Sequence, residues 1–333
     1  MRINKNVMKL VGLALFAVII SRIDFRELSQ VFRNISLPGL ILAAVLVLPQ
    51  ILIKAYRWNY IKKLQGINYH LKDSFLMYGA GLYLGLVTPG RIGDFLKVMF
   101  LRNDGHPFGK SLLSVFLDRI LDLVFLLLIG YIGMVSFFTL FREEVYVLSG
   151  ILGAGVILLG IIFLKKHWWR ALVQRIVAML SKRYKEKAGI TVDEFYQELR
   201  SFTVEGWVVI SVLTIITWSI YFLQIFILAQ SLHIGIGFIS MAIFASIADV
   251  ISILPLSISG IGTRDITLIV LFERVGIHKE AALAISLLML FLTGIGALLG
   301  LTCWLKKPIP LSQEKAPKKE KAAAHSTSEP TLE

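Results

Sequence analysis

Two short stretches place glycines beside one arginine and one aspartate, inside otherwise apolar sequence. The first covers residues 88–94 and reads Thr-Pro-Gly-Arg-Ile-Gly-Asp. The second covers residues 255–265 and reads Pro-Leu-Ser-Ile-Ser-Gly-Ile-Gly-Thr-Arg-Asp. Charged side chains at membrane depth are costly and therefore indicate function. Gly/Pro interruptions at corresponding positions of two halves are typical of transporter binding sites, so both breaks are candidate functional sites.

The chemistry that these residues favour is anion binding. If each break reaches the middle of a membrane, the apolar arm that follows begins there as a helix N-terminus, whose amides and dipole attract an anion. Glycines permit tight turns and close backbone approach, and arginines add donors in a fork that matches phosphate or carboxylate. The predicted substrate-binding residues are Arg91, Arg264, Gly90, Gly93, Gly260 and Gly262.

Further charged residues lie inside apolar segments and form a predicted intramembrane network. Its members are Asp94, Asp118, Arg119, Asp122, Asp249 and Asp265. Asp94 and Asp265 are expected in the first turn of the second arms, where each either fixes the turn or takes part in function. Asp118 and Asp122 share a helix face.

These buried charges have two readings each. Asp118, Arg119 and Asp122 form either a static buried network or a group that neutralises Arg91 or serves a proton-coupled step. Asp249 is either a protonatable carboxylate or a side chain hydrogen-bonded to a nearby serine. The Arg57-Trp58 pair is predicted to anchor a span end at the membrane interface.

The elements that must position these residues are membrane-spanning helices. The chain has 333 residues, of which 56% are hydrophobic, as in a polytopic membrane protein. Six stretches have the length of about 17–25 residues that a full span needs: 7–23, 37–53, 111–137, 145–164, 207–230 and 281–305. Residues 74–101 and 238–272 each have a second arm too short to cross, which predicts two re-entrant helical hairpins.

The distribution of basic residues predicts the topology. Lys and Arg number five in 54–72, nine in 165–205 and six in 306–321, against three in 21–36, one in 140–146, none in 231–237 and two in 273–280. The positive-inside rule places the first group in the cytoplasm, together with both termini. The predicted fold is therefore an all-α polytopic membrane protein, with six spans and two hairpins in an inverted-topology repeat.

The predicted domain organisation follows from these spans. A transmembrane domain covers residues 1–305, in halves of about 1–140 and 141–305, and residues 306–333 form a disordered basic tail. A cytoplasmic amphipathic loop covers residues 165–205. Thr191 and Glu194 match a capping box, and the helix that they open would bury Val192, Phe195, Leu199 and Phe202.

Several other functions are disfavoured. A single cysteine and six scattered histidines argue against a metal site. We expect no cofactor, because Gly260-Ile261-Gly262 lacks a strand–helix unit and no Walker loop is present. The net charge is +13. The basic residues lie in loops beside apolar spans, a distribution that favours contact with anionic lipid headgroups rather than with nucleic acid.

Three motifs together resemble a known family. The run from Tyr83 to Asp94, the run from Asp118 to Asp122 and the run from Ser259 to Asp265 look like the lysylphosphatidylglycerol synthase transmembrane (flippase-like) family, in the family order. The resemblance covers about residues 1–305. Aspartate stands at three positions where the family commonly has glutamate, and Ser259 stands where a glycine is common.

The resemblance implies a function for the membrane domain. In bifunctional relatives this domain flips an aminoacylated phospholipid that a separate soluble synthase domain makes. About 28 residues follow the last predicted span, too few for an enzyme domain, so we expect no lysyltransferase activity. Stand-alone relatives are linked to cell-envelope lipid or glycan assembly, and the cargo therefore does not carry over.

Three hypotheses follow. The first is a lipid translocase of the cytoplasmic membrane that moves an anionic or modified phospholipid, or a lipid-linked envelope precursor, between leaflets. The second is a membrane enzyme or accessory subunit that transfers groups to lipid-linked substrates in envelope biogenesis, with Asp94, Asp118 or Asp265 as base. The third is a non-catalytic protein that docks an envelope-synthesis enzyme through residues 165–205.

Overall fold

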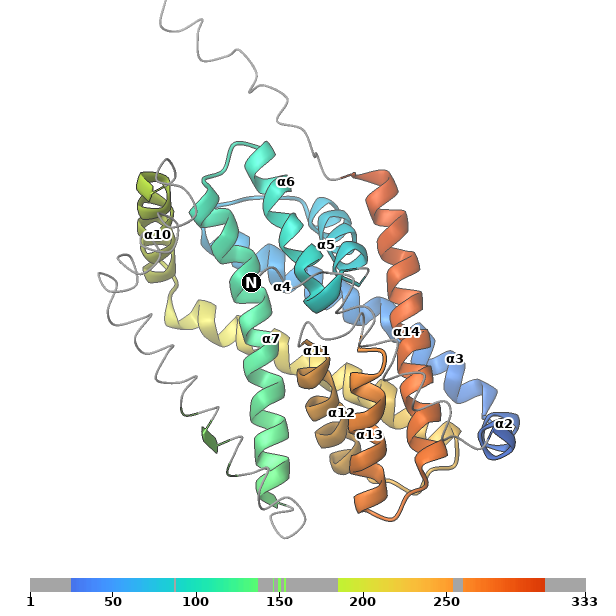
Figure 1. Cartoon of the computed structure of the whole chain (residues 1–333). Helices are drawn as coiled ribbons and strands as arrows, with labels where there is room; N and C mark the ends of the chain where they lie inside the picture. The colour runs from blue at the N-terminus through green and yellow to red at the C-terminus, as the bar shows by residue number, and fades with distance from the viewer. Residues whose placement is uncertain are drawn as a thin grey trace, which may run out of the picture.

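The computed structural model describes residues 25–86, 88–136, 146, 149–150, 153, 185–253 and 260–308, and within them every regular element is helical. Figure 1 shows their arrangement. In chain order the elements are α2 (Phe25–Arg33), α3 (Leu37–Val45), α4 (Val47–Leu64), α5 (Leu71–Leu86), the 3₁₀-helix η1 (Pro89–Leu96), α6 (Lys97–Asn103), α7 (Phe108–Ser136), α10 (Lys185–Arg200), α11 (Val204–Ser231), α12 (Phe238–Ile253), α13 (Thr263–Arg274) and α14 (Lys279–Lys306).

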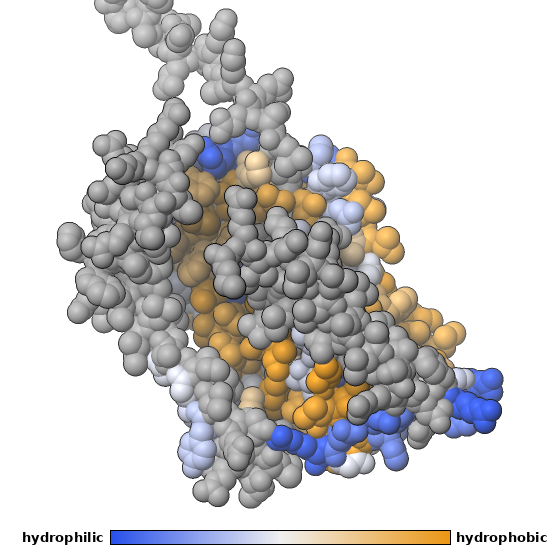
Figure 2. Space-filling model, in the orientation of Figure 1, coloured by the Kyte–Doolittle hydropathy of each residue, from blue (hydrophilic) through white to orange (hydrophobic). Residues whose placement is uncertain are grey.

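Three helical segments of the described residues are long and apolar enough to cross a membrane. They are Leu37–Leu64, which joins α3 and α4, together with α11 and α14. Large apolar side chains on these helices face outward, and Leu298 and Leu305 are 65% and 67% exposed. In Figure 2 apolar surface lies between hydrophilic residues at the two ends of the molecule. Apolar surface on this scale is stable against lipid rather than water, so the chain is a membrane protein.

The first of these segments is longer than predicted. The expected span 37–53 ended before Lys54 and Arg57, but the helix continues to Leu64. The helix is interrupted at Leu46, between α3 and α4. Pro49, three residues later, has no N–H to bond the preceding turn, while Gln50 N still donates to Leu46 O at 3.3 Å. The helix can continue past these basic residues because carboxylates of another helix compensate the charges on α4, as described below.

Two helix pairs hold the glycine-rich breaks. The first pair is α5 followed by η1 and α6, and the second is α12 followed by α13. Figure 1 shows the first pair in the upper half of the molecule and the second in the lower half. The pairs meet where α12 contacts η1, so elements that lead into the two breaks are neighbours in space.

The first break has a tighter backbone than expected. Asp94 lies in the 3₁₀-helix η1, three residues before α6 begins, and not in the first turn of an α-helix as predicted. The backbone of η1 packs directly on α5, because a Cβ atom at Gly93 would lie 2.2 Å from Leu84 O. Gly93 N donates instead to Thr88 Oγ1 at 2.8 Å. The close approach of the two backbones requires glycine at this position.

Small residues also let α14 pack against α5. A Cβ atom at Gly300 would lie 2.6 Å from Gly79 O, and one at Gly79 would lie 2.7 Å from Cys303 Sγ. Close backbone approach through small residues is the usual way in which membrane helices associate. Helix α5 is thereby fixed to the long helix α14.

Helix α10 packs on the beginning of α7. It begins at Lys185, so Thr191 lies inside the helix and the predicted capping box does not open it. Glu194 Oε2 instead accepts a hydrogen bond from Gly109 N at 2.8 Å, in the first turn of α7. The predicted apolar face is confirmed, since Val192, Leu199 and Phe202 are buried.

Some predicted segments lie outside the described residues. These are the span 7–23, nearly all of the span 145–164, the loop residues 165–184, the turn residues 254–259 and the tail from 309 onward.

Candidate functional site

A cluster of ion pairs occupies the interior between α4, α7 and α11. The Arg57 side chain is fully buried, with Nη2 lying 2.7 Å from Asp118 Oδ1 and Nη1 lying 2.8 Å from Asp122 Oδ1. Nη1 also donates to Thr214 Oγ1 at 2.9 Å. The predicted interface anchor is therefore wrong, because both Arg57 and Trp58 are 0% exposed. The guanidinium fork joins three helices by charge-assisted hydrogen bonds.

The same cluster extends to the first glycine-rich break. Lys97 Nζ lies 3.3 Å from Asp118 Oδ2 and 3.5 Å from Asp94 Oδ1. Arg119 bridges the same two aspartates, with Nη1 at 3.1 Å from Asp94 Oδ2 and Nη2 at 2.9 Å from Asp118 Oδ2. Lys97 reaches this position over Gly81, where a Cβ atom would lie 2.4 Å from Lys97 Cγ. The structure therefore brings together Asp94, Asp118 and Arg119, three members of the charged network named from the sequence.

Aromatic side chains complete the lining of the cluster. Tyr78 Oη accepts a hydrogen bond from Arg119 Nη2 at 2.7 Å, and Lys97 Nζ lies 4.3 Å from the centre of the Tyr78 ring. Trp218 Nε1 donates to Asp122 Oδ1 at 2.9 Å. Cation–π contacts and donors of this kind lower the cost of burying charge.

The second break contains a separate charged group at the start of α13. Gly260 and Gly262 have φ values of +78° and +88°, which glycine adopts readily. Gly262 N donates to Asp265 Oδ2 at 2.8 Å, so Asp265 fixes the turn, one of its two predicted roles. Arg264 donates from Nε to Ser286 Oγ and from Nη2 to Ser286 O, each at 3.0 Å. The Ser286 hydroxyl in turn donates to Asp265 Oδ1.

The environment of Arg264 differs from that of the other buried arginines. Arg264 is 4% exposed, yet within the described part of the chain no carboxylate oxygen lies within 4.0 Å of its guanidinium. Arg264 is linked to the Asp265 carboxylate through the Ser286 hydroxyl. A buried guanidinium with two hydrogen bonds to one serine has donor capacity left for an anion.

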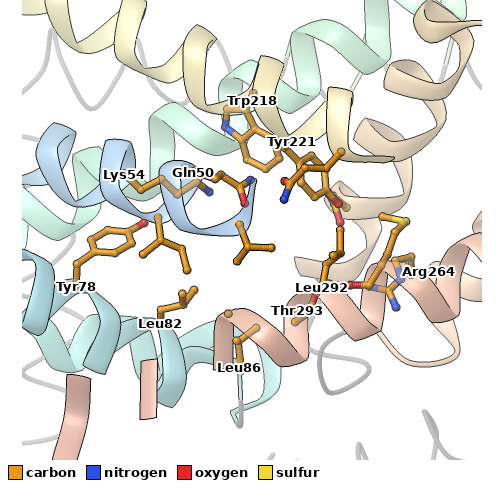
Figure 3. Close-up of a pocket in the computed structure, with 16 residues that line it drawn as sticks. Gln50, Lys54, Tyr78, Leu82, Leu86, Trp218, Tyr221, Arg264, Leu292 and Thr293 are labelled. Carbon is orange, nitrogen blue, oxygen red and sulfur yellow. Dashed lines mark hydrogen bonds between the residues drawn. The ribbon is translucent and has the colours of Figure 1, made fainter. Parts of the chain in front are cut away.

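A central cavity of about 100 Å³ joins the two groups. Figure 3 shows Tyr78 and Arg264 on opposite sides of it, with Lys54 and Gln50 on α4 and Trp218 and Tyr221 on α11. Asp249, predicted as an intramembrane carboxylate, also lines this cavity. Because Lys54 Nζ lies 3.5 Å from Asp122 Oδ2, the cavity reaches from the edge of the ion-pair cluster to Arg264.

Other predictions have mixed outcomes. The side chains of Arg91 and the neighbouring turn residues, Gly90 included, lie outside what the structure describes, so the predicted meeting of Arg91 with Arg264 stays a prediction. Sequence reasoning missed Lys54, Arg57 and Lys97. Lys97 follows Asp94 by three residues, a spacing typical of ion pairs on a helix, and that signal could have identified it.

The buried carboxylates that could bind a metal ion or act as a base already contact other groups of the protein. Across the described residues there is no cluster of three His, Cys, Asp or Glu side chains that could hold a metal ion. Asp118 contacts Arg57, Lys97 and Arg119, and Asp265 accepts from Gly262 and Ser286. The arrangement favours the binding of an anion rather than proton abstraction by one of these carboxylates.

The chain is similar to known membrane proteins. UPF0104 membrane proteins of two archaea match most of the chain: that of Methanocaldococcus jannaschii is 26% identical over 86% of this chain and 90% of its own length. That of Pyrococcus horikoshii is 25% identical over 86% of this chain and 91% of its own length. No solved structure matches. Residues 9–300 match the family described as the lysylphosphatidylglycerol synthase TM region, and the chain belongs to this family.

Proposed function

We propose that this membrane protein is a lipid translocase that moves an anionic lipid or lipid-linked precursor between leaflets, with the headgroup phosphate bound in the central cavity. The observation that carries the proposal is Arg264. Its guanidinium is buried, lines the cavity and has no carboxylate partner among the described residues. Lys54 lines the same cavity. A phosphate would accept hydrogen bonds from the arginine fork.

The size of the cavity indicates that the protein must open to bind a headgroup. At about 100 Å³ the cavity is smaller than the roughly 300–1,000 Å³ of ordinary ligand sites. We infer a closed conformation, in which the two hairpin-bearing halves separate alternately toward each side.

The proposal includes the finer topology. Six spans, two re-entrant hairpins related as an inverted repeat, and both termini in the cytoplasm together give alternating access to one site. The opposite placement of α5–α6 and α12–α13 supports this arrangement (Figure 1). In it, Arg91 of the first turn faces the same site as Arg264, and Gly90 and Gly93 allow the turn that places it there.

A vesicle assay tests the function. Purified protein is reconstituted with fluorescent phosphatidylglycerol or fluorescent phosphatidylcholine, and a membrane-impermeant quencher reports the exposed fraction over time. We expect faster redistribution of phosphatidylglycerol with protein, and loss of about tenfold or more in rate for Arg264→Gln, because one charged hydrogen-bonding group is removed. The matched control is Arg274→Gln, an exposed arginine on the same helix.

The outcomes separate clearly. Redistribution by the wild type no faster than in protein-free vesicles, for both lipids, would refute translocation of these lipids. Equal rates for Arg264→Gln and Arg274→Gln would refute the role of Arg264 while leaving translocation intact.

A further inference from the structure

A second cavity lies beside the central one, between α7 and α12. It measures about 200 Å³ and is lined by apolar side chains of three elements: Phe95, Phe116, Ile120, Leu123, Leu126 and Ile253. Four of these residues are spaced at intervals of three or four along α7, so one face of that helix forms a wall. Phe95, from η1, is 38% exposed, and the cavity is therefore open at this side. We refer to it as the lateral cleft.

The packing of α7 against α12 explains why the cleft exists. Further along α7 the two helices touch: a Cβ atom at Gly133 would lie 2.3 Å from Ile243 Cγ1, and one at Gly130 would lie 3.3 Å from Ile247 Cγ1. Between residues 116–126 of α7 and the end of α12 such contacts give way to the cavity. Small residues at one point and large ones beyond it make two helices diverge. The cleft is a consequence of how these helices cross.

The inner end of the cleft is polar, unlike its walls. Arg119, Asp122 and Asp249 line it. The two Nη groups of Arg119 contact Asp94 and Asp118, but its Nε–H is buried and has no acceptor among the described residues. An unmet buried donor is costly. A phosphate oxygen at this position would satisfy it.

A thin wall separates the cleft from the central cavity. Trp218 and Asp249 line both, and Lys54 Nζ lies 4.6 Å from the centre of the Trp218 ring. Asp122 faces the cleft, whereas its partner Lys54 faces the central cavity. Their ion pair, at 3.5 Å, is longer than the contacts of Asp122 with Arg57 at 2.8 Å and with Trp218 at 2.9 Å. Moving Trp218 and parting this pair would join the two spaces.

We propose that the lateral cleft binds a phospholipid on its way to the central cavity. One acyl chain lies between α7 and α12, against the apolar walls, and the phosphate accepts a hydrogen bond from Arg119 Nε. Trp218 and the Lys54–Asp122 pair form the gate. An apolar opening with a cationic donor at its inner end, in a membrane-spanning fold, matches a lipid because both parts of the ligand find complementary groups. The assignment rests on the proposed function.

Photo-crosslinking tests the site directly. Full-length protein in phosphatidylcholine vesicles receives a trace of phosphatidylglycerol with a photoactivatable acyl chain, and crosslinked residues are located by mass spectrometry. We expect crosslinks on the walls of the cleft at Leu123, Ile253 and Phe95. Leu123→Trp fills the cleft and lowers these crosslinks about tenfold. The control, Leu128→Trp, changes a 48% exposed residue of the same helix and leaves them unchanged.

A second variant tests the phosphate contact. Arg119→Lys keeps the positive charge near the aspartates but removes the Nε–H, so cleft crosslinks fall. Because lysine cannot bridge Asp94 and Asp118 as the guanidinium does, the thermal midpoint in detergent also falls, and crosslinking is therefore compared well below the midpoint of this variant. Crosslinks restricted to outward-facing residues such as Leu128, or cleft crosslinks that Leu123→Trp does not lower, would overturn the proposal. The same vesicles report translocation. Translocation without cleft crosslinks refutes only the cleft, and cleft crosslinks without translocation refute only the proposed function.

Discussion

Replacing Arg57 by methionine tests whether the ion-pair cluster holds the helices together. Methionine keeps an unbranched apolar stem in place of the aliphatic part of the arginine side chain, and it removes the charge and all donors. The change deletes the contacts to Asp118 Oδ1 at 2.7 Å and to Asp122 Oδ1 at 2.8 Å, together with the bonds to Asp118 O and Thr214 Oγ1. It leaves two carboxylates buried with less compensation than before.

The expected magnitude follows from the burial of both partners. Arg57 and Asp118 side chains are 0% exposed and that of Asp122 is 8% exposed. Removing one partner of a buried ion pair costs about 3–5 kcal/mol. Since about 1 kcal/mol shifts the thermal midpoint of a domain of 150–250 residues by roughly 2–4 °C, the midpoint should fall on the order of 10 °C.

The assay is thermal unfolding in detergent, followed by intrinsic tryptophan fluorescence. Tyr56→Met is the control, because Tyr56 precedes Arg57 on α4 and is 46% exposed. The double variant Arg57→Met with Asp122→Asn restores the charge balance, so it should recover part of the loss. A shift for Arg57→Met no larger than that of the control, or a double variant less stable than the single one, would refute the reasoning.

Three further predictions concern positions where backbone packing, backbone conformation or a contact at a helix end determines the stability. Gly300→Ala should lower the thermal midpoint, because its Cβ would lie 2.6 Å from a backbone oxygen of α5. Gly294→Ala, in open space on the same helix, should raise the midpoint, because alanine stabilises a helix by about 1 kcal/mol relative to glycine. A higher midpoint for Gly300→Ala than for Gly294→Ala would contradict this packing. Glu194→Ala should speed limited proteolysis within α10, since the acceptor for the first turn of α7 is lost, and the exposed Gln197→Ala should not. Gly262→Ala should cost about 1 kcal/mol or more in stability, because its φ of +88° is unfavourable for alanine; an unchanged midpoint would argue against this turn.

The membrane character and the turn chemistry could be predicted from sequence because both depend on local patterns. Apolar length identified the segments that became α11 and α14. At the second break, glycines followed by an aspartate indicated a tight turn that the aspartate either fixes or uses in function, and Gly262 N donates to Asp265. Both features are encoded by residues that are close together in the sequence, so they can be recognised without knowing the fold.

The core of the ion-pair cluster could not be predicted because its partners are distant in sequence. Arg57 contacts side chains 61 and 65 residues away, and from sequence alone it was interpreted as an interface residue. The same reasoning counted Lys54, Arg57 and Lys62 among the basic residues of a cytoplasmic loop, whereas all three lie on α4. In the sequence, a basic residue inside a membrane helix looks the same as a basic residue in the loop after the helix. Only the carboxylates that contact it in the fold distinguish the two.

The distribution of charge separates the structural role of the cluster from the proposed binding role of Arg264. Lys54, Arg57, Lys97 and Arg119 share three carboxylates through contacts of 2.7–3.9 Å. An anion could bind most of these cations only by displacing a carboxylate, which would then be buried without compensation. Arg264 carries no such cost, because among the described residues its acceptors are the uncharged oxygens of Ser286. An anion in the central cavity therefore gains most at Arg264, and mutations in the cluster should act on stability before they act on binding.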